Sequence, residues 1–488
     1  MSNETPMSPA QRKLLGVILV PLFMSLLSIS IVNVVLPSLQ VSIGASNSSL
    51  QWVLSGYTLA FGVLLVAAGR AGDLFGRGKL FVVGLVFFGV GSLAAGLAGS
   101  PLLLNLARIV MGLGSGMLSP QGVGMIQQYF HGKARGRAFG MFGTVVGVSV
   151  AIGPILGGSF IALFGGDWGW RLSFLVNVPI AAAALIIGRY WLPGDAWSGE
   201  DQAGSIDDPA PKRRRADFDP IGVLLLSVGT LLVMLPFLER SLGAWMYSLL
   251  VIGAGLVVVW VWWETRYARR GGAPMVDMEL FRTRSFASGA LLSSVYFVGT
   301  PCVWVVVALY LQDGMHFSAL TAGLIGLPSA AFSAIVPQIT GRVVFTYGRK
   351  LVVWGVGVAL LAVLGSIAVV LAVEAYGLSP WWLMASLAIL GIAQGMVISP
   401  NQTLTLAEVP VKYAGSSGGV MQTGQRVGTA IGIAVITAVF FAGLSAGGYA
   451  VAFVMAFIGI GIVLVLTGIV GLTDLQLSRR SRARAQPA

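Results

Sequence analysis

The stretch Gly69-Arg-Ala-Gly-Asp73-Leu-Phe-Gly76-Arg77-Gly-Lys79 lies between two long apolar runs. It returns in reduced form as Gly341-Arg342-Val-Val-Phe345-Thr-Tyr-Gly348-Arg349-Lys350. In both copies a Gly-Arg pair is followed, after five residues, by a second Gly-Arg pair, and Asp73 of the first copy corresponds to Phe345 of the second. Two copies of one charged turn predict a chain built from two homologous halves.

The composition around these turns predicts an all-α integral membrane protein. Hydrophobic residues make up 56% of the 488 residues and charged residues only 10%, and the mean hydropathy is +0.87. A soluble domain carries about 25% charged residues. Backbone polar groups in lipid must be paired internally, and long apolar runs rich in Gly and Ala favour helices over the alternating strands of a barrel.

The apolar runs predict fourteen transmembrane helices, since a crossing needs about 20 mostly apolar residues. The expected crossings are 14–37, 50–69, 79–98, 102–125, 137–163, 170–192, 220–238, 244–264, 286–312, 318–341, 350–373, 379–403, 416–442 and 448–472. The alternative is twelve, if 220–264 is a hairpin outside the main bundle. Both counts are even, so both termini face the same side. The first run is too long for a signal peptide and lacks a small-residue cleavage site.

The predicted organisation is two six-helix halves with an insert between them. Its segments are a cytoplasmic N-terminus (1–13), the first half (14–192), a linker (193–219), an inserted hairpin (220–264), a second linker (265–285), the second half (286–472) and a basic tail (473–488). The first linker is rich in Asp, Gly, Ser and Pro and contains Lys212-Arg-Arg-Arg215, which favours a solvated segment with a basic anchor.

The cations predict a plasma-membrane protein with both termini in the cytoplasm. Of 30 Lys and Arg residues, all but Arg108, Arg171, Arg240 and Arg426 fall at the same face as the predicted termini or in its loops, and Lys and Arg prefer the cytoplasmic side. The net charge of +12 is explained by this placement and by attraction to membrane lipids. No nucleic-acid partner is predicted.

Residues suited to catalysis or metal binding are scattered. Cys302 is the single cysteine, so the chain alone forms no disulfide, and the two histidines, His131 and His316, fall in loops on opposite sides. No paired carboxylates or Ser-His-Asp set lies in a predicted crossing. We therefore expect no enzyme activity, no metal and no cofactor.

Several motifs in order resemble the major facilitator superfamily, in its fourteen-helix drug:proton antiporter branch. Besides the turn at 69–79, Arg108-Ile-Val-Met-Gly112-Leu-Gly114-Ser-Gly116 and Gly153-Pro154-Ile-Leu-Gly157-Gly158 are similar to family motifs, the latter to one associated with exporters. Ile31-Val-Asn33-Val-Val-Leu-Pro37 and the segment from Asp167 to Pro179 are typical of the branch. The resemblance covers about Leu14 to Leu472. It implies a monomeric secondary transporter that exports a small amphipathic compound by alternating access, about a midplane site between two rocking halves.

The resemblance implies a conformational latch in the charged turn. Its members are Gly69, Asp73, Gly76, Arg77, Lys79 and Arg349. Asp73 can accept hydrogen bonds from a helix N-terminus or from Arg77, so it can hold one state and release it in another. A charged loop that serves only membrane topology is the competing interpretation.

A second predicted feature is a functional bend in the fifth crossing. It consists of Gly153, Pro154, Gly157 and Gly158. Proline removes a backbone donor, while the glycines allow a neighbouring helix to approach closely. Ordinary helix packing explains the glycines alone equally well.

Three charged residues are candidates for a buried or coupling charge: Arg108, Asp313 and Arg426. Arg108 lies about one-third of the way into its crossing, where a guanidinium is costly unless it has partners. Snorkelling to the outer surface, about 10 Å away, is the alternative. Arg426, beside Gln422 and Gln425, can instead snorkel inward.

One departure from the branch affects coupling. The first crossing of the branch usually contains Asp-x-Thr-Ile-Val-Asn, whereas this chain has Ser28-Ile-Ser30-Ile-Val-Asn33. A serine, Ser28, stands where the acid of the branch is expected, and no Asp or Glu of this chain is predicted to lie at mid-membrane. Export is therefore either uncoupled from a proton gradient or coupled through a peripheral acid, Asp313 or Asp73.

The substrate pocket is expected to favour neutral or anionic compounds, because Arg108 has no predicted compensating carboxylate. Each candidate lining residue can instead serve as an interhelical hydrogen bond or an interfacial anchor. These candidates are Ser28, Asn33, Gln51, Tyr57, Tyr296, Trp304, Asn401, Gln402 and Gln422. The alternatives to drug export are a lipid or metabolite exporter or facilitator without proton coupling, and a non-transporting receptor on the same fold.

Overall fold

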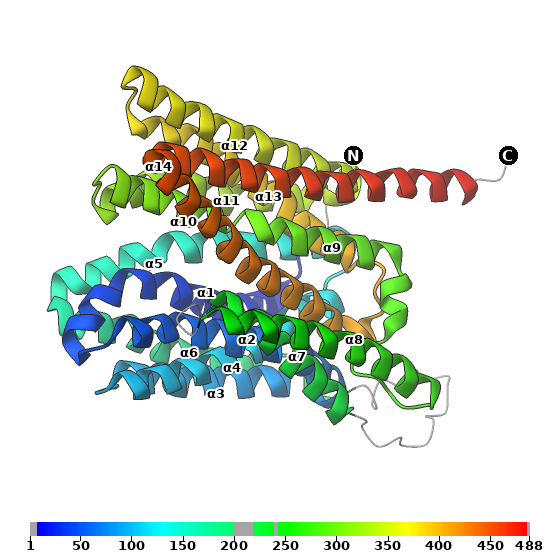
Figure 1. Cartoon of the computed structure of the whole chain (residues 1–488). Helices are drawn as coiled ribbons and strands as arrows, with labels where there is room; N and C mark the ends of the chain where they lie inside the picture. Colours follow the sequence, from blue (N-terminus) through cyan, green and yellow to red (C-terminus); the bar gives the residue numbers. More distant parts are fainter. Residues whose placement is uncertain (1–6, 200–217, 239–242, 486–488) are drawn as a thin grey trace. The chain divides into compact units, whose positions relative to one another are not determined.

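A computed structural model describes residues 7–199, 218–238 and 243–485. The predicted basic cluster at 212–215 and Arg240 lie outside the described residues. All regular structure in the described part of the chain is helical, as Figure 1 shows. The long helices are α1 (Pro9–Ile43), α2 (Asn47–Phe75), α3 (Arg77–Gly96), α4 (Pro101–Tyr129), α5 (Gly132–Leu175), α6 (Asn177–Trp191), α7 (Pro220–Leu238), α8 (Tyr247–Arg269), α9 (Arg284–Gly299), α11 (Ala319–Tyr347), α12 (Arg349–Tyr376), α13 (Leu383–Thr405) and α14 (Ala414–Ala485).

Shorter helical segments connect or extend these helices. They are η1 (Gly194–Trp197), η3 (Ala244–Met246), η4 (Met278–Arg282), α10 (Cys302–Ala308), η5 (Leu309–Gly314), η6 (Pro380–Trp382) and η7 (Val411–Tyr413). The segment from α9 through α10 to the π-helical η5 forms one candidate membrane span, Arg284–Gly314. Within the described ranges, 12 spans are long and apolar enough to cross a membrane.

Two of these spans are far longer than one crossing requires. Gly132–Trp191 has 60 residues and Val411–Leu477 has 67, whereas a helix of about 20 residues spans the hydrocarbon. The first changes direction at Gly165, whose φ of 77° is open to glycine at little cost. A Cβ added to Gly169 would lie 2.6 Å from the Cα of Ile161. In a straight helix these positions would be about 12 Å apart, so the chain folds back on itself.

The long helix α14 folds back in the same way. Gly447 and Gly448 have non-helical backbone angles, with φ of 85° at Gly448. A Cβ added to Gly443 would lie 2.7 Å from the Cα of Ala452, although nine residues of straight helix extend about 14 Å. Figure 1 shows α14 as two arms, orange and red, that meet at this turn.

The predicted extent of the charged turns was wrong. α2 continues through Gly69 and Asp73 to Phe75, so the turn between α2 and α3 consists of Gly76 alone, with φ of 107°. The second copy behaves alike, because α11 runs to Tyr347 and only Gly348, with φ of 55°, separates it from α12. Polar residues at the membrane boundary do not end a helix when their backbone groups stay paired.

The chain divides into two compact units that differ from the predicted halves at two places. Unit 1 contains Met1–Ala134, Ile152–Arg282 and Val409–Thr423, and unit 2 contains Arg135–Ala151, Thr283–Glu408 and Gly424–Ala488. The beginning of α14 therefore belongs to unit 1, and residues Arg135–Ala151 of α5 belong to unit 2.

Close contacts at small residues hold the helices of each unit together. In unit 1, a Cβ added to Gly112 of α4 would lie 2.5 Å from the carbonyl oxygen of Tyr57 in α2. In unit 2, a Cβ added to Gly391 of α13 would lie 2.2 Å from the carbonyl oxygen of Ser329 in α11. Helices in lipid associate by such backbone contacts, because burying apolar surface gains little there.

The hairpin of α7 and α8 packs within unit 1. Gln51 of α2 donates a hydrogen bond to the carbonyl oxygen of Leu238 at 2.8 Å, and Ser55 donates to the same oxygen at 3.3 Å. The last residue of α7 is thus tied to the first turns of α2.

Candidate functional site

Arg108 is buried in unit 1 among neutral partners. Its side chain is 1% exposed, so it does not snorkel to the surface. Nε donates to the carbonyl oxygen of Val53 at 2.9 Å, and Nη1 donates to Oγ of Ser28 at 3.1 Å. The guanidinium carbon lies 4.2 Å from the centre of the Tyr57 ring, a favourable cation–π arrangement. Arg108 thus keeps a fixed positive charge with neutral partners from α1 and α2.

Two of the predicted cavity residues belong to the support of Arg108. Ser28 is fully buried, at 0% exposure, and occupies the position where the resemblance implies an acid. Tyr57 is also fully buried, and its hydroxyl bonds to Ser115 of α4 at 2.6 Å and to the carbonyl oxygen of Ser25 at 2.9 Å. Three helices therefore hold the ring under the guanidinium.

Asp73 caps the beginning of α14. Its carboxylate accepts hydrogen bonds from the backbone N–H groups of Gly415 and Ser416, both at 2.9 Å. Arg77 donates to the same carboxylate from Nη2 at 2.7 Å. Both kinds of donor considered for Asp73 are thus present, and the acid is 5% exposed. A carboxylate at a helix N-terminus is stabilised by the free N–H groups and by the helix dipole.

Three other predicted latch residues contribute to the contact between Asp73 and α14, and Lys79 does not. Gly69 lets α14 approach α2, because a Cβ added there would lie 2.3 Å from the carbonyl oxygen of Gly415. Gly76 provides the positive φ of the turn, and Arg77 also donates to the carbonyl oxygen of Val411 at 2.6 Å. Lys79 is exposed and lies apart from this network.

The end of the α7–α8 hairpin where α7 begins and α8 ends contains two acids that the sequence analysis did not single out. Glu264 is 0% exposed and Asp219 is 1% exposed. A Cβ added to Gly222 would lie 2.3 Å from Oδ2 of Asp219 and 2.7 Å from Oε1 of Glu264. The two carboxylates therefore converge on one point, and indole N–H groups of Trp263 and Trp260 bond to them.

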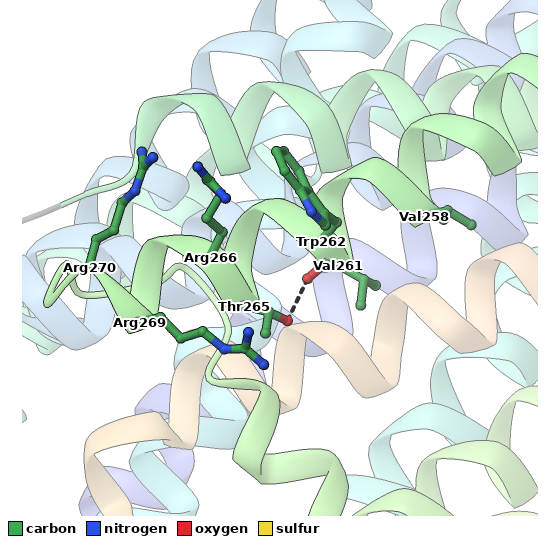
Figure 2. Close-up of a pocket in the computed structure, with 7 residues that line it drawn as sticks. All are labelled: Val258, Val261, Trp262, Thr265, Arg266, Arg269 and Arg270. Carbon is green, nitrogen blue, oxygen red and sulfur yellow. Dashed lines mark hydrogen bonds between the residues drawn. The ribbon is translucent and has the colours of Figure 1, made fainter.

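The face of α8 that points away from α7 carries a groove. Its lining includes Trp262, Arg266, Arg269 and Arg270, and its volume is about 640 Å³. Figure 2 shows the arginines gathered toward one end of the helix.

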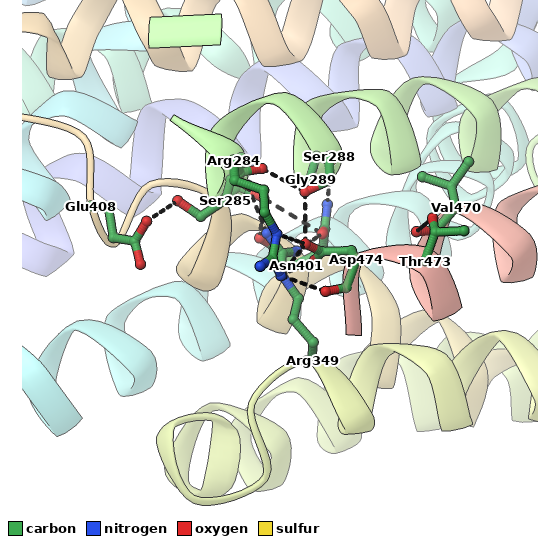
Figure 3. Close-up of polar contacts among 11 residues, drawn as sticks. Arg284, Ser285, Ser288, Gly289, Arg349, Asn401, Glu408, Val470, Thr473 and Asp474 are labelled. Carbon is green, nitrogen blue, oxygen red and sulfur yellow. Dashed lines mark hydrogen bonds and ion pairs between the residues drawn. The ribbon is translucent and has the colours of Figure 1, made fainter. Parts of the chain in front are cut away.

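Unit 2 contains a second charged network, centred on Asp474 of α14. Asp474 is 3% exposed and pairs with Arg349 at 2.8 Å and with Arg284 at 3.0 Å. Ser288 adds a hydrogen bond at 2.9 Å. Figure 3 shows the two arginines reaching the carboxylate from different helices. The second Gly-Arg turn has Phe345 at the position that corresponds to Asp73, and its acid partner is instead Asp474 of α14.

Asn401 belongs to this network and not to an open cavity. It is 2% exposed, accepts a hydrogen bond from Nη1 of Arg349 at 2.6 Å and donates to the carbonyl oxygen of Gly289 at 2.9 Å. Its neighbour Gln402 is buried as well, at 4% exposure.

The remaining candidates are dispersed. Asp313, the peripheral candidate for coupling, is exposed, and Arg426 is half-buried. Asn33 is exposed and bonds to its own helix at Ile29. Of the aromatic candidates, Tyr296 is 1% exposed and its hydroxyl has no hydrogen-bond partner among the described residues, while Trp304 packs on Gly326.

The polar candidate on α14, Gln422, links two helices of unit 1. It is 7% exposed and accepts a hydrogen bond from Ser119 of α4 at 2.6 Å.

The glycines of the predicted bend do not behave as a set. A Cβ added to Gly153 would lie 2.5 Å from Oγ of Ser30, and one added to Gly157 would lie 3.0 Å from the Ile31 side chain. These two glycines bring α5 against α1. Gly158 has nothing within 4 Å of the corresponding position, so its predicted role in a close approach was wrong. The helix continues through Pro154, and its non-helical residue is Gly165.

The residues that sequence reasoning missed are Asp474, Arg284, Asp219 and Glu264. The sequence contained a signal for a partner such as Asp474. The second turn keeps Arg349 but has Phe345 at the position of Asp73, and a retained cation implies an acid elsewhere in the chain. Asp474 lies just beyond the last predicted crossing and was assigned to the basic tail. No group of three or more metal-ligating side chains occurs in the part of the chain that the structure describes.

Long apolar helices joined by short turns, with isolated charged networks at helix ends, define a polytopic membrane protein. The chain belongs to the major facilitator superfamily, whose family profile matches residues 18–433. It is therefore a secondary transporter and not an enzyme, and the resemblance to the superfamily that the motifs indicated is confirmed.

Comparison with individual proteins agrees with this assignment. The chain is 36% identical to the probable actinorhodin transporter of Streptomyces coelicolor, over 85% of this chain and 70% of that protein. It is 28% identical to the tetracenomycin C resistance and export protein of Streptomyces glaucescens, over 84% and 72%. The fold is similar to the crystal structure of the human organic anion transporter MFSD10 (TETRAN), with a TM-score of 0.67 and 14% identity, covering 95% of this chain and 100% of that one.

Proposed function

We propose that this transporter exports a small amphipathic compound across the plasma membrane by alternating access, as a monomer with both termini in the cytoplasm. Two relatives support export: one is named a probable actinorhodin transporter and another a resistance and export protein. The cation distribution supports the orientation, since Lys and Arg favour the cytoplasmic side.

The proposed topology has fourteen crossings. The two overlong spans, of 60 and 67 residues, each fold back at glycine, and their arms are each long enough to cross the hydrocarbon. Counting each as two crossings turns the 12 spans into fourteen.

We further propose that the substrate is neutral or anionic, and Arg108 carries this proposal. Its partners are a carbonyl oxygen, a hydroxyl and an aromatic ring, so its positive charge is not cancelled locally. Because the side chain is 1% exposed, it acts on a substrate through its field. In a low-dielectric interior such a field repels cations over several ångströms.

The contact of Asp73 with the beginning of α14 is proposed as the latch. Opening the cytoplasmic side requires the N-terminus of α14 to leave the carboxylate, and protonation of Asp73 would weaken its charge-assisted hydrogen bonds. If transport is proton-coupled, Asp73 is thus a better coupling candidate than the exposed Asp313.

The test is transport by purified protein in liposomes, with a panel of cationic, neutral and anionic amphiphiles. Each compound is measured with an imposed proton gradient and with that gradient collapsed. We expect anionic and neutral compounds to move faster than cations of the same size. Faster transport of cations would overturn the charge preference, and no transport of any compound would favour a lipid substrate or a receptor.

A further inference from the structure

One face of α8 combines an apolar half with a cationic half. The residues that line its groove recur at positions i, i+3, i+4, i+7 and i+8, as residues on a single helical face do. They are Val258, Val261, Trp262, Thr265, Arg266, Arg269 and Arg270. In Figure 2 the three arginines gather at one end of the helix, and Val258 and Val261 lie toward the other.

Among the residues that the structure describes, no acid pairs with the cationic half. Arg266, Arg269 and Arg270 are exposed, and within the described ranges none of them forms an ion pair. Arg266 instead lies over the ring of Trp262, 5.5 Å from its centre. Glu264, the nearest acid along the helix, is fully buried and bonds to Trp260 at 2.7 Å. The groove therefore presents three guanidinium groups to whatever occupies it.

The opposite face of α8 is already covered by α7. A Cβ added to Gly253 would lie 2.8 Å from the backbone nitrogen of Val233, and Trp260 and Glu264 are buried. The hydroxyl of Thr265, in the middle of the groove, donates to the carbonyl oxygen of Val261 at 2.7 Å. This hydroxyl is thus satisfied, and the polar recognition in the groove comes from the arginines.

The length of the groove matches one leaflet of a bilayer. From Val258 to Arg270 a helix rises about 18 Å, and half of a hydrocarbon core of about 30 Å is about 15 Å. An occupant with an anionic head at the arginines would thus place an apolar tail along Trp262, Val261 and Val258, toward the midplane.

We propose that this groove binds one anionic phospholipid of the cytoplasmic leaflet. Its phosphate lies among Arg266, Arg269 and Arg270, where guanidinium groups can bond phosphate oxygens in a bidentate manner. One acyl chain lies along the valines, beside the indole of Trp262 at the interface. Basic residues at a helix end serve membrane orientation wherever they point, whereas here all three line one groove together with the indole and the valines, so that the head and tail of one lipid can bind side by side.

The experiment is native mass spectrometry of the purified full-length chain, titrated with phosphatidylglycerol and separately with phosphatidylcholine. We expect one phosphatidylglycerol per chain at saturation and at least tenfold weaker binding of phosphatidylcholine. The triple variant R266Q/R269Q/R270Q should lose affinity for phosphatidylglycerol on the order of a hundredfold, at about fivefold for each arginine.

A matched control removes the same charge elsewhere. Arg12, Arg342 and Lys350 are exposed cations outside the groove, and R12Q/R342Q/K350Q should bind phosphatidylglycerol as the unmodified chain does. Because the groove variant removes part of the topology signal, R266K/R269K/R270K provides a second test. It keeps the charge, and its affinity should fall several-fold through loss of the bidentate geometry.

Three results would overturn the proposal. They are equal losses in the groove and control variants, equal binding of the two lipids, and unchanged affinity in both groove variants.

Discussion

The carboxylate of Asp73 accepts a hydrogen bond at 2.9 Å from the backbone N–H of Ser416, 343 residues further along the chain. A helix leaves its first N–H groups unpaired, and α14 has two of these satisfied by one acid. Because Gly69 and Gly415 have no side chains, their backbones can lie closely enough for this contact. A motif that is local in sequence thus determines where a distant helix begins.

Replacement of Asp73 by Asn should loosen the first turn of α14. Asparagine keeps one oxygen but loses the charge, and hydrogen bonds to a charged group contribute about 1.5–3 kcal/mol. Hydrogen exchange of the peptide 411–423 should accelerate on the order of tenfold, and transport should slow. The exposed Glu279→Gln is the control. Unchanged exchange in Asp73→Asn would show that the acid does not hold the turn.

Replacement of Ser28 by Asp should change the charge preference of the transporter. Oγ of Ser28 lies 3.1 Å from Nη1 of Arg108, so an aspartate there would form a buried ion pair and cancel the positive field. The ratio of anion to cation transport should fall roughly tenfold if the interaction energy between the site and a charged substrate changes by about 1.4 kcal/mol. Ser28→Ala leaves the charge of Arg108 in place and should preserve the ratio. Equal ratios in both variants would contradict a role for this charge.

Replacement of Asp474 by Asn should strongly destabilise unit 2. The acid pairs with Arg284 and Arg349, and removing one member of a buried ion pair costs about 3–5 kcal/mol. Thermal unfolding in detergent should report this loss. Adding Arg349→Gln to Asp474→Asn should recover part of the stability, because it removes the more deeply buried of the two cations that lose their acid. Glu374→Gln, at an exposed position, should leave the unfolding temperature unchanged.

The two glycines Gly153 and Gly158 should respond oppositely to alanine. At Gly153 the new Cβ would lie 2.5 Å from Oγ of Ser30 and 2.9 Å from the nitrogen of Ile31. Overpacking of this kind costs about 1–3 kcal/mol. At Gly158 nothing lies within 4 Å, so alanine should be neutral or stabilise the helix by up to about 1 kcal/mol. Unfolding temperatures of the two variants, measured side by side, would reveal the difference, and equal shifts would argue against a tight α1–α5 contact.

The class of protein and the repeat were predictable from sequence, because apolar length and charged turns are local signals. The acceptor role of Asp73 was also within reach, since its residue type and position imply a donor. The retained Arg349 implied a partner somewhere, but the identity of that partner, Asp474, could not be predicted, because the pairing arises from the packing of α14 beside α9 and α12. Asp219 and Glu264 converge for a similar reason: their meeting depends on the α7–α8 contact. Gly158 resembles Gly157 in sequence, and only the position of α1 distinguishes them.

The single-glycine turn at Gly165 also bears on how the chain enters the membrane during synthesis. A straight helix of 60 residues would be about 90 Å long, three times the hydrocarbon thickness. Until the chain folds at Gly165, much of its apolar surface would project into water, which is unfavourable. With no loop between them, neither arm can be stably placed without the other. The two arms are therefore expected to leave the insertion machinery together, as a preformed helical hairpin.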